Sequence, residues 1–252
     1  MSNAPVLASL ETPRWVSARG SQDLLDHWEP RPLQSWVLRQ ASMRLGILRG
    51  DPPSNLLVVG MPGDAAGPVL ALQLAVFAAS MGTRTAFVIA TAHPSAARMR
   101  AACHRGADRE VRPYLTTYSD MVPPVKEGLG QAPELTVTFV VADADQAELA
   151  RLPSRSITTL AVSSGYANAD TLARTALACL DAGHPLAGVF LANADPSDPT
   201  SGDLSPTPFP RSEEAWADQD HRGVGKGTPS DPAPLDRELG VQRAEASGHE
   251  PR

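Results

Sequence analysis

The chain has 252 residues, with 28 Asp and Glu against 22 Lys and Arg and a formal net charge of −6. This length suits one large domain, or one medium domain with tails. The whole net charge lies in residues 195–252, which hold 12 acidic and 6 basic side chains and leave 16 of each in the rest. A neutral body with an acidic end offers no basic face to DNA or RNA, so we expect no nucleic acid partner.

Composition also divides the chain. Residues 195–252 contain nine prolines and almost no apolar runs. Such a segment buries too little surface to offset the entropy of ordering it, which predicts an acidic, Pro-rich, disordered tail. Residues 1–33 carry four prolines and little periodicity, which predicts an irregular lead. The expected domain is therefore 34–194.

Two further features bear on the cellular compartment. Cys103 and Cys179 fit neither a disulfide framework nor a CxxC metal pattern, and both lie in apolar helical stretches. We interpret them as buried structural thiols. The first residues lack the features of a signal peptide, and no stretch reaches the ~18 apolar residues of a membrane span. These patterns predict a cytoplasmic protein.

Regular elements follow one another in a fixed alternation. In residues 35–48, Leu38, Ala41, Leu45 and Leu48 recur at spacings of three and four, which indicates a helix. Expected strands and helices then alternate: strand 56–59, helix 69–80, strand 85–90, helix 95–105, strands 135–142 and 157–163, helix 170–182 and strand 186–193. Apolar strands separated by helices predict a three-layer, doubly wound α/β fold with a mostly parallel sheet.

The loop after the first of these strands is the candidate ligand site. In open α/β sheets ligands bind beyond the carboxyl ends of the strands. This loop runs from Gly60 to Gly67 and contains Gly63 and Asp64. Its glycines permit close backbone approach, and the next helix presents free N–H groups to an anion. A turn that binds nothing explains the same residues, and both interpretations stay open.

The loop lacks the chemistry of a working phosphate-binding loop. A P-loop needs a lysine for the β and γ phosphates and a hydroxyl for magnesium, in the order GK[ST]. Here Pro68 and Val69 follow Gly67, and the first lysine of the whole chain is Lys126. Losing one preorganised contact costs about 2.7–4 kcal/mol in the transition state, so we expect no turnover. We expect no resident cofactor, and ATP with Mg²⁺ is the ligand to test.

Three stretches resemble the cytoplasmic P-loop domain of the bacterial tyrosine autokinases of exopolysaccharide synthesis, relatives of the MinD and ParA ATPases. They are residues 36–45 (WVLRQASMRL) with 56–60, residues 67–75 (GPVLALQLA) with 81–89, and residues 159–167 with 180–193. In the last stretch Gly183, Gly188 and Asn193 fall where the family pattern places them. The resemblance implies a P-loop-like fold and a place in polysaccharide assembly. It also implies recruitment to the inner face of the cell membrane, with a chain-length co-polymerase or an active homologous ATPase as partner.

The motifs that define activity in that family are missing. The GK[ST] residues and the Asp-x-Asp after the second strand are absent, and the third motif retains only Asp143. Asp143 could hold a metal through water, although a solvated loop residue is the simpler interpretation. The tyrosine-rich C-terminal cluster is absent too. These departures predict a catalytically degenerate protein that acts through interaction or regulation.

Two other functions compete with this prediction. The glycine spacing of 60–67 also resembles a dinucleotide loop of Rossmann type, which usually has an Asp or Glu about 20 residues further on. The corresponding strand end offers Ala90, Thr91 and His93 instead. A hydrolase is disfavoured because Ser163-Ser164-Gly165 forms no GxSxG elbow. His184, after a helix-ending glycine, is interpreted as a helix cap or surface residue.

Overall fold

The computed structural model describes residues 4–12, 17–48, 54–105, 110–118, 132–142, 148–153 and 155–194. All of them belong to one unit, Met1–Ser205. The predicted tail, 195–252, lies outside the described residues.

Eight strands form one sheet in the order β1-β8-β7-β2-β6-β3-β5-β4. The strands are β1 (Val6–Leu10), β2 (Ser54–Gly60), β3 (Thr85–Ile89), β4 (Glu110–Arg112), β5 (Leu115–Tyr118), β6 (Leu135–Val141), β7 (Ile157–Ser163) and β8 (Leu186–Ala192). Neighbouring strands run parallel except β4, which pairs antiparallel with β5. The mostly parallel sheet predicted from the sequence is confirmed.

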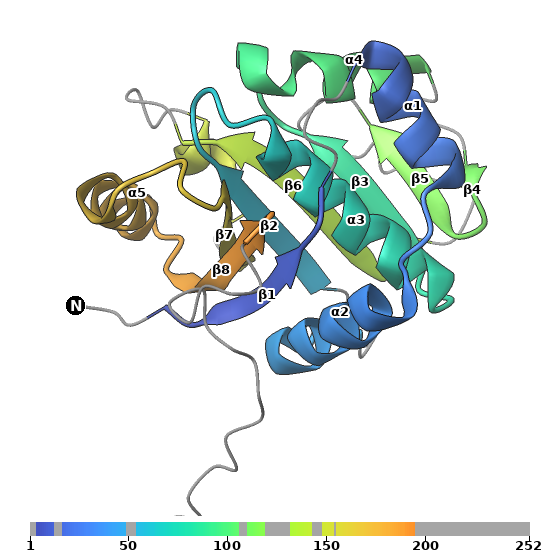
Figure 1. Ribbon diagram of the computed structural model, residues 1–252, viewed down its shortest axis with the longest axis horizontal. Coiled ribbons are helices and arrows are strands. Elements are labelled where there is room, and N and C mark those ends of the chain that lie inside the picture. The colour runs from blue at the N-terminus through green and yellow to red at the C-terminus, as the bar shows by residue number, and fades with distance from the viewer. Residues whose placement is uncertain are drawn as a thin grey trace, which may run out of the picture. The chain divides into compact units, whose positions relative to one another are not determined.

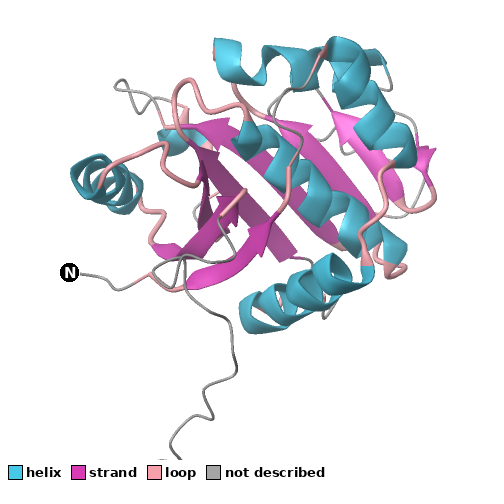
Figure 2. Ribbon diagram, in the orientation of Figure 1, coloured by secondary structure: helices cyan, strands magenta, loops and turns pink. Residues whose placement is uncertain are grey.

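Helices cover both faces of the sheet (Figures 1 and 2). They are α1 (Ala18–His27), α2 (Pro32–Leu45), α3 (Ala66–Ser80), α4 (Ala97–Arg105) and α5 (Ala169–Asp181), with 3₁₀ turns η1 (Pro94–Ala96) and η2 (Leu149–Arg151). One core joins α1 to α4 to one face of the sheet, and a second joins α5 and η2 to the other. Adjacent β2 residues serve opposite cores: Leu56 and Val58 the first, Leu57 and Val59 the second. This alternation produces the three layers.

Helix α3 is the centre of the first core. Every residue from Ala66 to Ala79 is buried, because the sheet covers one side and α1 and α2 contact the helix as well. A helix that is apolar all round is stable only when it is buried in this way. It therefore holds the loop that precedes it in a fixed position at the end of β2.

Local signals account for several helix ends. Pro32 stands at the start of α2, where its missing N–H is not needed, and Gly46 (φ +69) ends it. At the start of α5, Asn168 accepts a hydrogen bond from the Thr171 N–H over 2.8 Å. The helix predicted from residue 95 is preceded by η1, which the side chain of His93 caps by accepting a hydrogen bond from the Ser95 N–H.

The prediction that residues 1–33 are irregular is wrong. This stretch contains β1, which pairs with β8 at the edge of the sheet, then α1 and the start of α2. The sequence signal is weak because β1 has five residues and gains its stability from β8, which is far away in the chain. Strand formation depends on such partners more than on intrinsic propensity.

Candidate functional site

The candidate loop lies at the carboxyl ends of the central strands. β2 ends at Gly60, and α3 begins at Ala66. The neighbouring strands end at the same edge, since Gly60 pairs with Val141 of β6 and with Ala161 of β7. The structure therefore brings Gly60, Gly63, Asp64 and Gly67 together at the predicted edge. Asp143, the fifth predicted site residue, lies outside the described residues.

Asp64 is buried inside this loop, with 3% of its surface exposed. Its Oδ1 accepts hydrogen bonds from the Ala66 N–H (2.9 Å) and from the Ser163 hydroxyl (2.8 Å). Its Oδ2 accepts one from the Ser163 N–H (2.7 Å). Hydrogen bonds to a charged acceptor are the strong ones. The loop thus already holds an anion, which belongs to the chain itself.

Gly60 and Gly67 pack against the ring of Phe139. A Cβ added at Gly60 would lie 2.6 Å from Phe139 Cζ, and one at Gly67 would lie 3.0 Å from Phe139 Cε2. Gly60 must therefore lack a side chain for β2 to pass over Phe139, and a side chain at Gly67 would make a tight contact with the same ring. This packing is sufficient to explain both glycines without a ligand.

Gly63 is an exposed turn residue beside the Tyr166 hydroxyl. Its φ of +83° favours glycine, and a Cβ there would lie 2.5 Å from the Tyr166 hydroxyl oxygen. That hydroxyl donates a hydrogen bond to the Pro62 carbonyl over 2.7 Å. The turn after β7 therefore ties the loop down at Asp64 and at Pro62.

Two backbone positions at the start of α3 have no N–H to offer a phosphate. The Ala66 N–H is bonded to Asp64, and Pro68 has no N–H. No Lys or Arg occurs between Gly60 and Met81. A phosphate-transfer site uses a cation and a metal to neutralise charge, whereas this loop presents a carboxylate.

The fold is shared with two solved structures. The chimerical protein CapA2B2 superimposes with a TM-score of 0.54 and 16% identity, over 76% of this chain and 95% of that one. The BceF tyrosine kinase domain does so with a TM-score of 0.53 and 18% identity, over 75% and 93%. The chain has a P-loop-like α/β fold. The fold expected from the sequence resemblance is thereby confirmed.

Sequence comparison adds nothing to this, because no protein-family model matches the chain and no curated protein matches it in sequence. At these identities the structural likeness concerns the fold. The function of this P-loop-like domain therefore has to be argued from its own residues.

The end of β3, where a dinucleotide site would place an acid, is closed by local contacts. The His93 Nδ1 lies 2.8 Å from the Ser95 hydroxyl, and the buried Thr91 accepts a hydrogen bond from the His93 N–H. Glu148 reaches the Ala92 N–H over 3.3 Å, a contact that the sequence could not indicate. The side chains of Thr91, His93 and Glu148 are thus each engaged in a hydrogen bond at this strand end.

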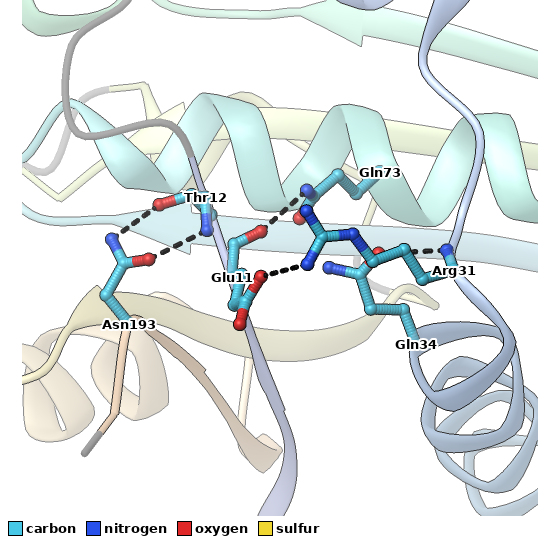
Figure 3. A network of polar contacts seen from close by, with 6 residues as sticks. All are labelled: Glu11, Thr12, Arg31, Gln34, Gln73 and Asn193. Carbon is cyan, nitrogen blue, oxygen red and sulfur yellow. Dashed lines mark hydrogen bonds and ion pairs between the residues drawn. The ribbon is translucent and has the colours of Figure 1, made fainter. Parts of the chain in front are cut away.

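Asn193 joins the end of β8 to the end of β1 (Figure 3). Its Oδ1 accepts from the Thr12 N–H and its Nδ2 donates to the Thr12 hydroxyl, both over 2.8 Å. Beside it, the Gln73 amide of α3 donates to the Glu11 carbonyl over 3.1 Å. The Asn193 side chain, which the sequence singled out, fastens β1 to the sheet.

The remaining candidates are structural. Both cysteines are buried, and this burial raises the pKa of Cys103 to about 12 and of Cys179 to about 11. Of the two interpretations of His184, the helix cap is confirmed, because its N–H donates to the Cys179 carbonyl at the end of α5. Its side chain is buried, with Nε2 3.1 Å from the Leu149 carbonyl. The described part of the chain contains no group of three potential metal ligands and no helix that could span a membrane.

Sequence reasoning missed the residues that close the loop. Ser163 ends β7, Tyr166 follows it and Phe139 lies in β6, so all three are distant from the loop in the chain. The position of Ser163 in the sequence could have indicated this contact, because Ser163 ends a strand parallel to β2 and therefore lies at the same edge of the sheet as Gly60.

Proposed function

We propose that this chain is a P-loop-fold protein that neither binds nor hydrolyses ATP productively and that acts as an interaction component, a pseudo-ATPase. The observation that carries the proposal is the buried Asp64 carboxylate, which accepts three hydrogen bonds where an anionic ligand would have to approach the start of α3.

Charge supports this proposal in a simple way. A triphosphate brought to this loop would approach a like charge, the Asp64 carboxylate, which is buried in the loop. Two unit charges 4 Å apart repel by about 4 kcal/mol at an effective dielectric constant of 20. No lysine or arginine of the loop offsets this repulsion. Binding of phosphate is therefore disfavoured before catalysis is considered.

The resemblance noted in the sequence suggests the setting. A protein with this fold and no turnover would serve exopolysaccharide or capsule synthesis by contacting a membrane chain-length co-polymerase or a catalytically active homologue. The fold likeness to the BceF tyrosine kinase domain agrees with this setting. The dinucleotide alternative gains no support from the contacts of Thr91 and His93.

Calorimetric titration of the full chain with ATP and Mg²⁺, followed by an ADP-release assay on the same sample, tests the proposal. We expect no binding at millimolar ATP, where ΔG is about −4.1 kcal/mol, and no ADP release. Steady turnover in the native chain would contradict the proposal outright.

The variant Asp64→Asn is the matched comparison, because it removes the charge and retains the size of the side chain. If repulsion by this carboxylate excludes phosphate, the variant binds ATP measurably more tightly than the native chain, and still without turnover. Equal behaviour of the two proteins would remove Asp64 from the explanation.

A further inference from the structure

Helix α5 carries an apolar face that the rest of the described chain leaves open. Leu177 and Leu180 are 58% and 54% exposed, whereas Thr175 and Cys179 on the opposite side are buried against the sheet. Two large exposed leucines one turn apart form a contiguous patch rather than scattered surface residues, and such patches mark interaction sites.

The patch borders a hollow of about 220 Å³ between α5 and the start of β8. It is lined by Ala4, Ala173, Ala176, Leu177, Leu180, Pro185 and Leu186. Along this helix face two alanines, Ala173 and Ala176, precede the two leucines, Leu177 and Leu180. The surface therefore combines projections of leucine size with a space that can receive them.

Charges flank the leucine in a self-complementary order. Asp170, Arg174, Leu177 and Asp181 follow one another at spacings of four, three and four, so they share one stripe of the helix. Arg174 pairs with Asp170 over 2.8 Å, and both side chains are at least 70% exposed. Asp181 stands at the other end of the same stripe.

We propose that this face binds a second copy of the chain, with the two α5 helices antiparallel about a two-fold axis near Leu177. In that arrangement Arg174 faces the partner's Asp181, and the partner's Arg174 faces Asp181, on either side of a leucine centre. A two-fold interface requires one patch that complements itself. The charge order meets this condition, and so does the Ala-Ala-Leu-Leu order, because an antiparallel copy sets its leucines against the alanines.

The expected affinity is modest. Thirteen residues of α-helix extend about 20 Å, and standard interfaces bury about 800 Å² on each partner. One helix face with its rim lies at the low end of that range. We expect a reversible dimer with a dissociation constant on the order of 10 μM.

Sedimentation equilibrium of the full chain tests the proposal, at concentrations from about tenfold below to about tenfold above that constant. The native chain should pass from monomer to dimer. Leu177→Glu should remain monomeric, because it places two charges in the apolar centre. The matched control is Leu33→Glu on α2, where Leu33 is 73% exposed, and it should associate like the native chain.

Reversing the charge of Arg174 or Asp181 tests whether the two α5 helices are antiparallel. Arg174→Glu and Asp181→Arg should each weaken association about tenfold or more, because both ion pairs become repulsive. Mixing the two variants should restore dimers near the native affinity, because each crossed pair is again attractive. Circular dichroism would verify that each variant is folded.

Three outcomes would overturn the proposal. They are a native chain that stays monomeric throughout, association that Leu177→Glu leaves unchanged while Leu33→Glu abolishes it, and charge variants that do not complement each other on mixing. The last two would place self-association on another surface.

Discussion

Asp64 is the residue on which the loop depends. It joins the start of α3 to the end of β7 by accepting hydrogen bonds from the Ala66 N–H and from the N–H and hydroxyl of Ser163. Because the carboxylate is buried, its removal leaves these donors in a place that water reaches poorly. Unsatisfied buried donors cost about 1–3 kcal/mol each.

We therefore expect Asp64→Ala to lower the free energy of unfolding by about 2–4 kcal/mol, measured by urea denaturation. Asp170→Ala is the control, since its exposed pair with Arg174 should contribute no more than about 0.5 kcal/mol. Similar losses in the two variants would mean that the Asp64 contacts add little to the fold.

The glycines of the loop show where sequence interpretation reaches its limit. The positions and the edge of the sheet were predicted, because strand ends and helix starts are local patterns. The reason for each glycine was not available locally. Gly60 and Gly67 pack against Phe139 of β6, and Gly63 lies next to the Tyr166 hydroxyl. A glycine-rich turn shaped by packing and one shaped by a phosphate look alike until these distant partners are placed.

The helices and strands also differ in how well the sequence predicts them. β7, α5 and β8 were predicted within one residue or so of their bounds, because their apolar runs and the glycine after α5 are visible in the sequence. β1 was missed because its support comes from β8 and from Asn193. Beyond the last backbone hydrogen bonds between β1 and β8, the side chain of Asn193 bonds to Thr12 and extends the connection between the two strands.

The Asn193 side chain should therefore stabilise the pairing of β1 with β8. Its φ of +53° suits Asn and Gly better than Ala. Asn193→Gly keeps this conformation and loses only the two bonds to Thr12, so we expect faster amide hydrogen exchange in β1 and a loss of about 1–2 kcal/mol. Asn193→Ala should lose about 1 kcal/mol more through backbone strain. Unchanged exchange at Val6–Leu10 in both variants would show that β8 pairing alone secures the strand.

At the scale of the whole molecule, the two cysteines report on the two cores. Cys103 belongs to the core between the sheet and α1 to α4, and Cys179 to the core beneath α5. Burial disfavours the thiolate and raises the pKa from 9.0 to about 12 for Cys103 and about 11 for Cys179. Both thiols should accordingly resist alkylation until the domain unfolds.

These raised pKa values predict a loss of stability in alkali. Well below pH 9 both thiols are protonated in the folded and the unfolded chain, so they do not affect the balance. Between pH 9 and about 11 to 12 the unfolded chain releases protons that the folded chain keeps, and the unfolding free energy falls as pH rises. The slope approaches about 1.4 kcal/mol per pH unit for each thiol. Urea denaturation of the native chain and of a Cys103→Ala, Cys179→Ala double variant, compared from pH 8 upward, isolates this effect from the titration of other groups. The variant should start less stable and lose stability more slowly, so that the two curves converge, whereas parallel curves would mean that the thiols ionise within the folded domain as readily as outside it.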